Sequence, residues 1–263
     1  MPVKLLLKFQ AGKKIPASSL KPKTVHGIFF SLLPKDIGEI FHVPSVKPFS
    51  LFYPAYFKSP NKNQISFTIE MNILNNKLFP KISQLLFRKA LLEKEFVANV
   101  DEVKLRLTTV KAKDVTTFES LMAKAKPLKE LIFDFVTPTT FKKGRYDYVL
   151  PEPYLVFKSL LNKWNAFSPI KISDKKLLSF VKKNILISGC WIKTKKTELM
   201  SRAKITGFSG RVFFYVANFD EEKLKILNAL SRFAEFSGVG RKTTMGFGKV
   251  KLAQKREGDE QDF

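Results

Sequence analysis

The stretch S-G-V-G-R-K-T-T-M-G-F-G-K-V, Ser237–Val250, contains four glycines within fourteen residues. It follows D-E-E-K-L-K-I-L-N-A-L-S-R-F-A-E-F, Asp220–Phe236, where apolar residues recur at helical spacing and acids occupy the first turn. Phe247, Val250 and Leu252 then indicate a short strand. The glycines therefore join a helix to a strand, and such a loop can bring backbone N–H groups close to a phosphate.

The two common nucleotide-binding loops do not fit this stretch. A Walker A loop needs a second glycine five positions after the first, but Met245 follows Gly240 at that distance and Thr243 follows Gly238. The dinucleotide fingerprint would also need glycine at position 243. Both of those loops leave a strand and open a helix, which is the reverse of the order here. Nucleoside triphosphates and NAD are therefore not expected ligands.

The charge of the chain indicates a polyanionic partner. Lysine and arginine number 47 against 23 acids, which gives a formal net charge of +24 over 263 residues. A solvated basic surface is the alternative, and an acidic membrane would favour an isolated basic amphipathic helix, which the sequence lacks. Eight of the 47 cations are arginine, so 39 are lysine. Lysine acts as a point charge toward phosphate, so most of this charge favours backbone contacts over base reading.

Cysteine and histidine content limits the other chemistry. Cys190 is the single cysteine, so no intrachain disulfide is expected, which suits the cytoplasm. One cysteine and two histidines do not favour a structural zinc site, and we expect no metal and no cofactor. The opening apolar run is short and interrupted by lysine, and no stretch approaches the ~20 apolar residues of a membrane span.

Periodicity predicts the same order of elements twice. The first half indicates strands at Val3–Phe9, Pro48–Tyr53, Gln64–Asn72 and Asp101–Lys111, and helices at Thr24–Leu33 and Leu78–Leu92. The second half indicates strands at Lys129–Val136, Ile185–Lys193 and Gly246–Leu252, a strand or hairpin over Thr197–Ala217, and helices at Pro153–Trp164, Asp174–Lys183 and Asp220–Phe236. The expected fold class is α+β, with two tandem ferredoxin-like (βαββαβ) domains.

The domain boundary is expected at a small, basic, proline-containing segment. The N-terminal domain would span residues 1–120 and a linker residues 121–128. The C-terminal domain would span residues 129–256 and contain the glycine-rich loop, 237–248. The acidic tail, 257–263, is expected to be disordered.

Three segments in this order resemble the CRISPR repeat-RNA processing endoribonucleases of the RAMP superfamily. They are G-V-G-R-K-T-T-M-G-F-G at Gly238–Gly248, T-P-T-T-F-K-K-G at Thr137–Gly144 with L-P-E-P-Y-L-V-F-K-S-L-L-N-K-W-N at Leu150–Asn165, and H-G-I-F-F-S-L-L at His26–Leu33 with His42 and V-K-P-F-S at Val46–Ser50. Together they span nearly the whole chain.

The resemblance implies cleavage of precursor CRISPR RNA within each repeat, without a metal. The ribose 2′-OH attacks the adjacent phosphate and the 5′-oxygen leaves, giving 2′,3′-cyclic phosphate and 5′-OH ends. It also implies repeat RNA as the partner, while a homodimer and association with other CRISPR effector subunits stay open. A non-catalytic RNA-binding subunit of an effector complex is the alternative function, and a general basic RNA chaperone is a third.

The resemblance assigns catalytic roles to His42, as general acid or base, and to Lys47, as stabiliser of the phosphorane. His26 on the first helix is a further candidate, because some family members use a histidine there. Some relatives have a tyrosine hydroxyl in that helix where this chain has Phe30, which cannot donate a proton. A packing role for His26 and a surface-loop role for His42 are the structural alternatives.

The candidate RNA-binding residues are basic or belong to the glycine-rich loop. They are Gly238, Gly240, Arg241, Lys242, Gly246 and Gly248, then Lys142, Lys143 and Arg145, then Lys193, Lys195, Lys196 and Arg202. For the last two groups, a solvated loop or strand face is the alternative.

Overall fold

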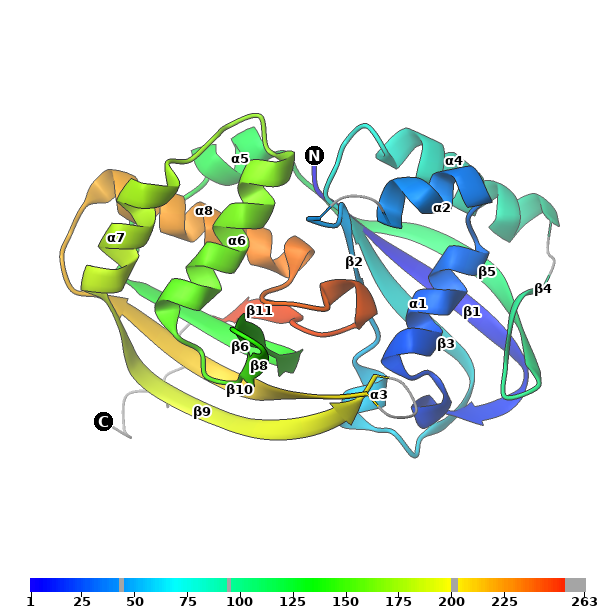
Figure 1. The fold of residues 1–263 in the computed structure, drawn as a ribbon. Coiled ribbons are helices and arrows are strands. Elements are labelled where there is room, and N and C mark those ends of the chain that lie inside the picture. Colours follow the sequence, from blue (N-terminus) through cyan, green and yellow to red (C-terminus); the bar gives the residue numbers. More distant parts are fainter. Residues whose placement is uncertain (43–44, 94–95, 200–202, 254–263) are drawn as a thin grey trace.

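The computed structural model describes residues 1–42, 45–93, 96–199 and 203–253. Two antiparallel β-sheets lie side by side, and helices cover one face of each (Figure 1). This confirms the α+β class. None of the described helices is both long and apolar enough to cross a membrane.

The first sheet contains five strands in the order β2-β3-β1-β5-β4. Their bounds are β1 Val3–Pro16, β2 Phe49–Phe52, β3 Asn63–Ile73, β4 Phe96–Val100 and β5 Val103–Val115. The helices of this half are α1 Pro22–Ser31, α2 Lys35–His42, α3 Ala55–Lys58 and α4 Phe79–Arg88, which continues into the π-helical turn η2 Lys89–Glu93; the short 3₁₀ turn η1 spans Ala17–Ser19.

Alternation along β1 produces the core of this half. Leu5, Leu7 and Phe9 are buried, whereas Lys8 and Gln10 between and beyond them are exposed. Phe29 of α1 reaches Phe49 of β2, with ring centroids 4.9 Å apart. The apolar face of the helices therefore closes over the apolar face of the sheet.

The second sheet has the order β11-β6-β10-β9. Its strands are β6 Glu130–Thr139, β9 Ile185–Glu198, β10 Lys204–Val216 and β11 Val250–Ala253, and a small hairpin pairs β7 Phe141–Lys143 with β8 Tyr146–Tyr148. The helices are α5 Phe118–Ala123, α6 Pro153–Phe167, α7 Asp174–Asn184 and α8 Glu221–Ser237, with the 3₁₀ turn η3 at Thr243–Met245. Trp164 packs between Phe118 and Phe233, with centroid distances of 5.0 and 5.5 Å.

Several elements differ from the sequence prediction. The last strand, expected from Gly246, begins at Val250, because Gly246 and Gly248 adopt φ of +92° and +72°, which an extended strand excludes. The segment Thr197–Ala217, expected as one strand or a hairpin, contains the end of β9 and the single strand β10, which pairs back along β9. The helices α2, α3 and α5, the strand β4 and the β7–β8 hairpin were not predicted.

The predicted linker, residues 121–128, begins inside α5. Phe118, Leu121 and Ala125 pack into the core of the second half. Thr117 caps the helix by accepting a hydrogen bond from the Ser120 N–H. Helix packing therefore starts before the expected boundary. The predicted acidic tail, 257–263, lies outside the described residues.

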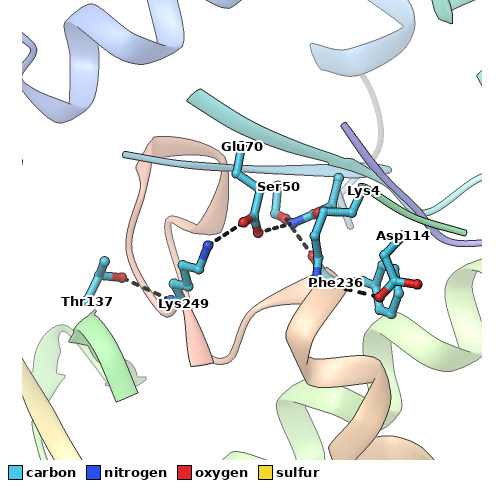
Figure 2. A network of polar contacts seen from close by, with 8 residues as sticks. Lys4, Ser50, Glu70, Asp114, Thr137, Phe236 and Lys249 are labelled. Carbon is cyan, nitrogen blue, oxygen red and sulfur yellow. Dashed lines mark hydrogen bonds and ion pairs between the residues drawn. The ribbon is translucent and has the colours of Figure 1, made fainter. Parts of the chain in front are cut away.

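A buried polar network joins the two halves (Figure 2). Lys249, just before β11, donates to Glu70 of β3 at 2.5 Å, and both side chains are about nine-tenths buried. Asn72 donates to Ser50 at 3.0 Å, and the Ser50 hydroxyl donates to the carbonyl of Phe236 at the end of α8, at 2.6 Å. Burial lowers the pKa of Lys249, and the neighbouring Glu70 opposes that effect.

Removing one partner of this ion pair should strongly destabilise the fold. We expect Lys249→Met to lower the free energy of unfolding by about 3–5 kcal/mol, because it leaves the Glu70 carboxylate buried without its cation. Urea denaturation followed by circular dichroism would measure the change.

Lys251→Met is the matched control, because Lys251 lies two residues along and is exposed; a change below about 0.5 kcal/mol is expected. The double variant Glu70→Gln, Lys249→Met should recover part of the loss. Equal effects of the two single lysine variants would contradict the structural role of the pair.

Candidate functional site

A cavity of about 570 Å³ opens where the glycine-rich loop meets both halves. One wall comes from the N-terminal half and the others from α6, β7 and the loop. Its lining residues are Ser45, Val46, Lys47, Phe141, Lys142, Leu155, Lys158, Ser159, Asn162, Lys163, Gly240, Arg241, Lys242, Thr243 and Thr244. The structure thus brings the predicted residues Lys47, Lys142, Gly240, Arg241 and Lys242 to one place.

Helix α6 presents its polar face to this cavity. Its apolar residues, such as Leu160 and Trp164, are buried in the core of the second half. Lys158, Ser159 and Lys163 lie on the other face, as the helical spacing requires. Sequence analysis missed these residues, although their spacing within the quoted segment Leu150–Asn165 would have placed them on one face.

The glycine-rich loop is closed by its own hydrogen bonds. The Gly238 N–H donates to the carbonyl of Ala234, and the Val239 N–H to that of Gly248. The Gly240 N–H donates to the hydroxyl of Ser159 at 2.8 Å. These three N–H groups bond within the protein, so phosphate binding stays a prediction for the N–H groups of the cavity-lining residues Lys242, Thr243 and Thr244. The loop also offers the cavity the side chains of Arg241 and Lys242.

The segment T-P-T-T-F is the base on which the loop rests. The Arg241 N–H donates to the Thr140 carbonyl at 3.0 Å, and the Gly248 N–H to the Pro138 carbonyl at 2.9 Å. The Lys249 N–H donates to the Thr137 hydroxyl at 2.9 Å. Two of the segments singled out in the sequence are therefore in direct contact.

The described wall of the cavity is strongly cationic. Its charged residues are Lys47, Lys142, Lys158, Lys163, Arg241 and Lys242, and no described lining residue is acidic. Asp147 of β8 lies beside the cavity and accepts a hydrogen bond from Arg241 at 2.8 Å. Lysine and arginine side chains at this density favour an anionic ligand of several charges.

Lys163 occupies a distinct position among these cations. Its ammonium donates to the carbonyls of Ser237 at 3.2 Å and Gly238 at 2.9 Å, at the end of α8. Burial lowers its pKa to about 7.

Among the N-terminal candidates, His26 packs against aromatic side chains. His26 of α1 stacks on Phe30, with centroids 4.6 Å apart, and lies 6.4 Å from Phe49. The turn η3 of the glycine-rich loop contacts α1 and β2. Figure 1 shows this loop, in dark orange, between the two halves. The described cavity lining includes Lys47 but not His26.

His42 is the last residue of α2, and its side chain lies outside the described residues. The sequence prediction placed it after the first helix, without a helix of its own. Ser45, three residues later, lines the cavity. Three residues span at most about 11 Å, so the backbone of His42 lies within that distance of the backbone at the cavity wall.

The remaining basic candidates divide between two places. Lys143 and Arg145 of the β7–β8 hairpin lie over the rings of Tyr148 and Tyr146, at 5.0 and 5.3 Å. Lys193 and Lys195 of β9 line a second hollow of about 1010 Å³, formed by the second sheet and by Phe57 and Lys58 of α3. Lys196 is exposed on the same strand, and Arg202 lies outside the described residues.

Comparison with known proteins gives a family for part of the chain and relatives for most of it. The family model described as CRISPR-associated endoribonuclease Cas6 matches residues 133–250. The CRISPR-associated endoribonuclease Cas6 of Mycobacterium tuberculosis is 24% identical over 228 residues, which cover 87% of this chain and 70% of that protein. The resemblance is confirmed.

Solved Cas6 structures share the fold over almost the full length. A Cas6 product complex superimposes with a TM-score of 0.81 at 25% identity and covers 96% of this chain and 100% of that one. Thermus thermophilus Cas6 gives a TM-score of 0.73 at 24% identity, covering 96% and 98%.

Glycine should be required at position 240 by a close contact as well as by backbone conformation. A Cβ there would lie 2.4 Å from the Thr140 carbonyl oxygen, and φ is +77°. We expect Gly240→Ala to lower the free energy of unfolding by at least about 1–3 kcal/mol, measured by urea denaturation.

Gly144→Ala is the control, because Gly144 has φ of +60° but nothing within 4 Å of a Cβ. We expect Gly144→Ala to lower the free energy of unfolding by less, because it introduces only the cost of a positive φ and no steric contact. If the two variants were equally stable, the contact with Thr140 would not restrict the loop.

Asp147 should compete with an anionic ligand for Arg241. We expect Asp147→Asn to tighten binding of a single-stranded RNA by up to about five-fold, since a partly exposed ion pair is worth at most about 1 kcal/mol. Fluorescence anisotropy would measure it. Glu221→Gln removes one acid from an exposed pair with Lys225 on α8 and should have a smaller effect. Weaker binding by Asp147→Asn would show that Asp147 instead holds Arg241 in its binding position.

Proposed function

We propose that this protein is an endoribonuclease that binds CRISPR repeat RNA in precursor crRNA and cleaves it without a metal ion. The carrying observation is the cationic cavity, which joins Lys47 of the N-terminal half to Arg241 and Lys242 of the glycine-rich loop. A phosphodiester bound there would meet several cations that stabilise the additional charge of the transition state.

The reaction needs a base for the 2′-OH and an acid for the leaving 5′-oxygen. Histidine suits both roles because it exchanges protons near neutral pH. His42 is proposed for one role, since it lies three residues before Ser45, which lines the cavity. Lys47 is proposed as the cation beside the phosphorane. The expected products are a 2′,3′-cyclic phosphate and a 5′-OH.

His26 is proposed as the second proton-transfer group. Its ring stacks on that of Phe30, which lies one turn further along α1, so the two side chains share one face of the helix. Phe30 has no hydroxyl, and His26 supplies an exchangeable proton beside it. The assignment of base and acid between the two histidines stays open.

The fold and partners are proposed on the same grounds. In the first sheet β1 lies between β3 and β5, and in the second sheet β6 lies between β10 and β11. In a βαββαβ unit the first strand likewise lies between the third and the fourth, so this order supports two tandem ferredoxin-like domains joined near residues 121–128. Repeat RNA is the proposed partner, and the similarity to a Cas6 product complex and to a Cas6 substrate-mimic complex supports it. A non-catalytic RNA-binding subunit is less favoured, because the similar M. tuberculosis protein is named an endoribonuclease.

The decisive experiment is cleavage of a repeat RNA from the source genome in the presence of EDTA. We expect one discrete cut by the wild-type protein, and none when the scissile nucleotide carries a 2′-deoxy ribose. Single-turnover rates should fall by about 10²–10⁴-fold in His42→Ala, the usual contribution of general acid–base catalysis.

His26→Ala and Lys47→Met complete the series. Loss of cleavage in His26→Ala alone would move the principal role to α1. Tight binding of the repeat by the wild-type protein without any cut would support the RNA-binding subunit and contradict the nuclease proposal.

A further inference from the structure

We propose that Lys163 is a positioning residue for this cleavage reaction, which holds the start of the glycine-rich loop against α6 and takes up a proton when an RNA phosphate enters the cavity. This inference rests on the proposed function, because it assumes that the cationic cavity receives an RNA phosphate. Nothing in the sequence pattern singled out this residue.

The first observation is geometric. Helix α8 ends at Ser237, and the chain reverses at Gly238, which has φ of +64°. The ammonium of Lys163 donates to the carbonyls of both residues. The last carbonyls of a helix have no partner within it, so a cation there satisfies them and opposes the negative end of the helix dipole.

The second observation is that Lys163 acts together with Ser159. These residues are four apart on α6, so they lie on one face of the helix. The Ser159 hydroxyl accepts from the Gly240 N–H at 2.8 Å. One turn of α6 thereby holds the loop on both sides of Val239, and the cationic side chain of Arg241 follows directly. The position of Arg241 in the cavity depends on this attachment.

The third observation is the charge around the amine. Lys158 shares its helix, Lys142 faces the cavity from β7, Lys47 from the N-terminal half, and Arg241 and Lys242 from the loop. Asp147 is the nearby acid, and it is paired with Arg241. From the end of α8, Lys163 meets carbonyl oxygens. These carbonyls favour the charged amine, whereas burial favours the neutral form and dominates, so the pKa of Lys163 is lowered in the free protein.

A phosphate would reverse this balance. An opposite charge within about 4–6 Å favours the charged form of an amine, so phosphate binding raises the pKa of Lys163 above its value of about 7 in the free protein. Binding then takes up a proton from solvent at pH values between the two pKa values. By linkage, RNA affinity is highest below pH 7 and weakens as the pH rises toward the pKa of the complex.

The expected size follows from this linkage. If the phosphate raises the pKa of Lys163 by about one unit, affinity should fall about five-fold between pH 7 and pH 9. Lys163→Arg retains both histidines, so the part of the slope that this variant loses belongs to Lys163.

The test uses the full chain and repeat RNA with a 2′-deoxy ribose at the cleavage position, so that binding is measured without cleavage. Affinity is measured by anisotropy from pH 7 to pH 9 at constant ionic strength. Lys163→Met should bind at least about ten-fold more weakly at pH 7 and lose the slope. Lys163→Arg stays charged throughout and should bind well with a flat profile.

Two controls separate the outcomes. Lys182→Met on α7 removes an exposed lysine away from the cavity and should keep the wild-type slope. Thermal unfolding shows whether each variant is folded. If Lys163→Met does not fold, Lys163→Arg alone decides whether Lys163 causes the pH dependence. Wild-type slope and affinity in Lys163→Met, or a wild-type slope in Lys163→Arg, would overturn the proposal. Absence of cleavage of unmodified RNA by the wild-type protein would instead contradict the proposed nuclease.

Discussion

The buried ion pair between Lys249 and Glu70 is the constraint on which the arrangement of this protein depends. The two residues are 179 positions apart and belong to different sheets, yet both are almost fully buried. A charge in such a place is tolerated only when its partner is present with good geometry. The pair therefore favours the observed placement of the two halves, and Ser50 reinforces it through the carbonyl of Phe236.

The glycine-rich loop takes its shape from that placement. It begins at the end of α8 and ends at Lys249, so both of its ends belong to the interface network. Between them its backbone N–H groups bond to Ser159, Thr140 and Pro138. A loop fixed in this way is a rigid support for Arg241 and Lys242, and a preorganised site loses less entropy when it binds its ligand.

Local sequence patterns predicted much of the fold and only part of the site. The alternation in β1 and the helical period of α8 are strong signals, and both elements are present. The start of the last strand was predicted too early, at Gly246, because hydrophobic periodicity carries no information on the positive φ of Gly246 and Gly248. The basic pair Arg241–Lys242 and Lys47 could be assigned from the family resemblance, but the polar face of α6 was overlooked within a segment read for its apolar residues.

The ion pair could not have been predicted in the same way. Glu70 occupies a polar position in a strand whose sequence alternates, as the exposed Thr68 does, so the pattern gives no sign of its burial, and Lys249 follows a loop already rich in cations. No local spacing relates them, since only the packing of the two sheets brings them together. Buried charge is thus the kind of interaction that sequence patterns reveal least, although it restricts the structure most.

A cavity built from both halves has a thermodynamic consequence. A ligand that contacts Lys47 on one side and Arg241 on the other binds only when the halves are in register, so its binding energy also stabilises the interface. In the absence of the ligand, the cations of the cavity repel one another, and the Lys249–Glu70 pair must hold the halves together against that repulsion. The strength of the interface and the density of positive charge in the cavity are therefore linked: a weaker interface would tolerate fewer cations, and fewer cations would bind RNA less well.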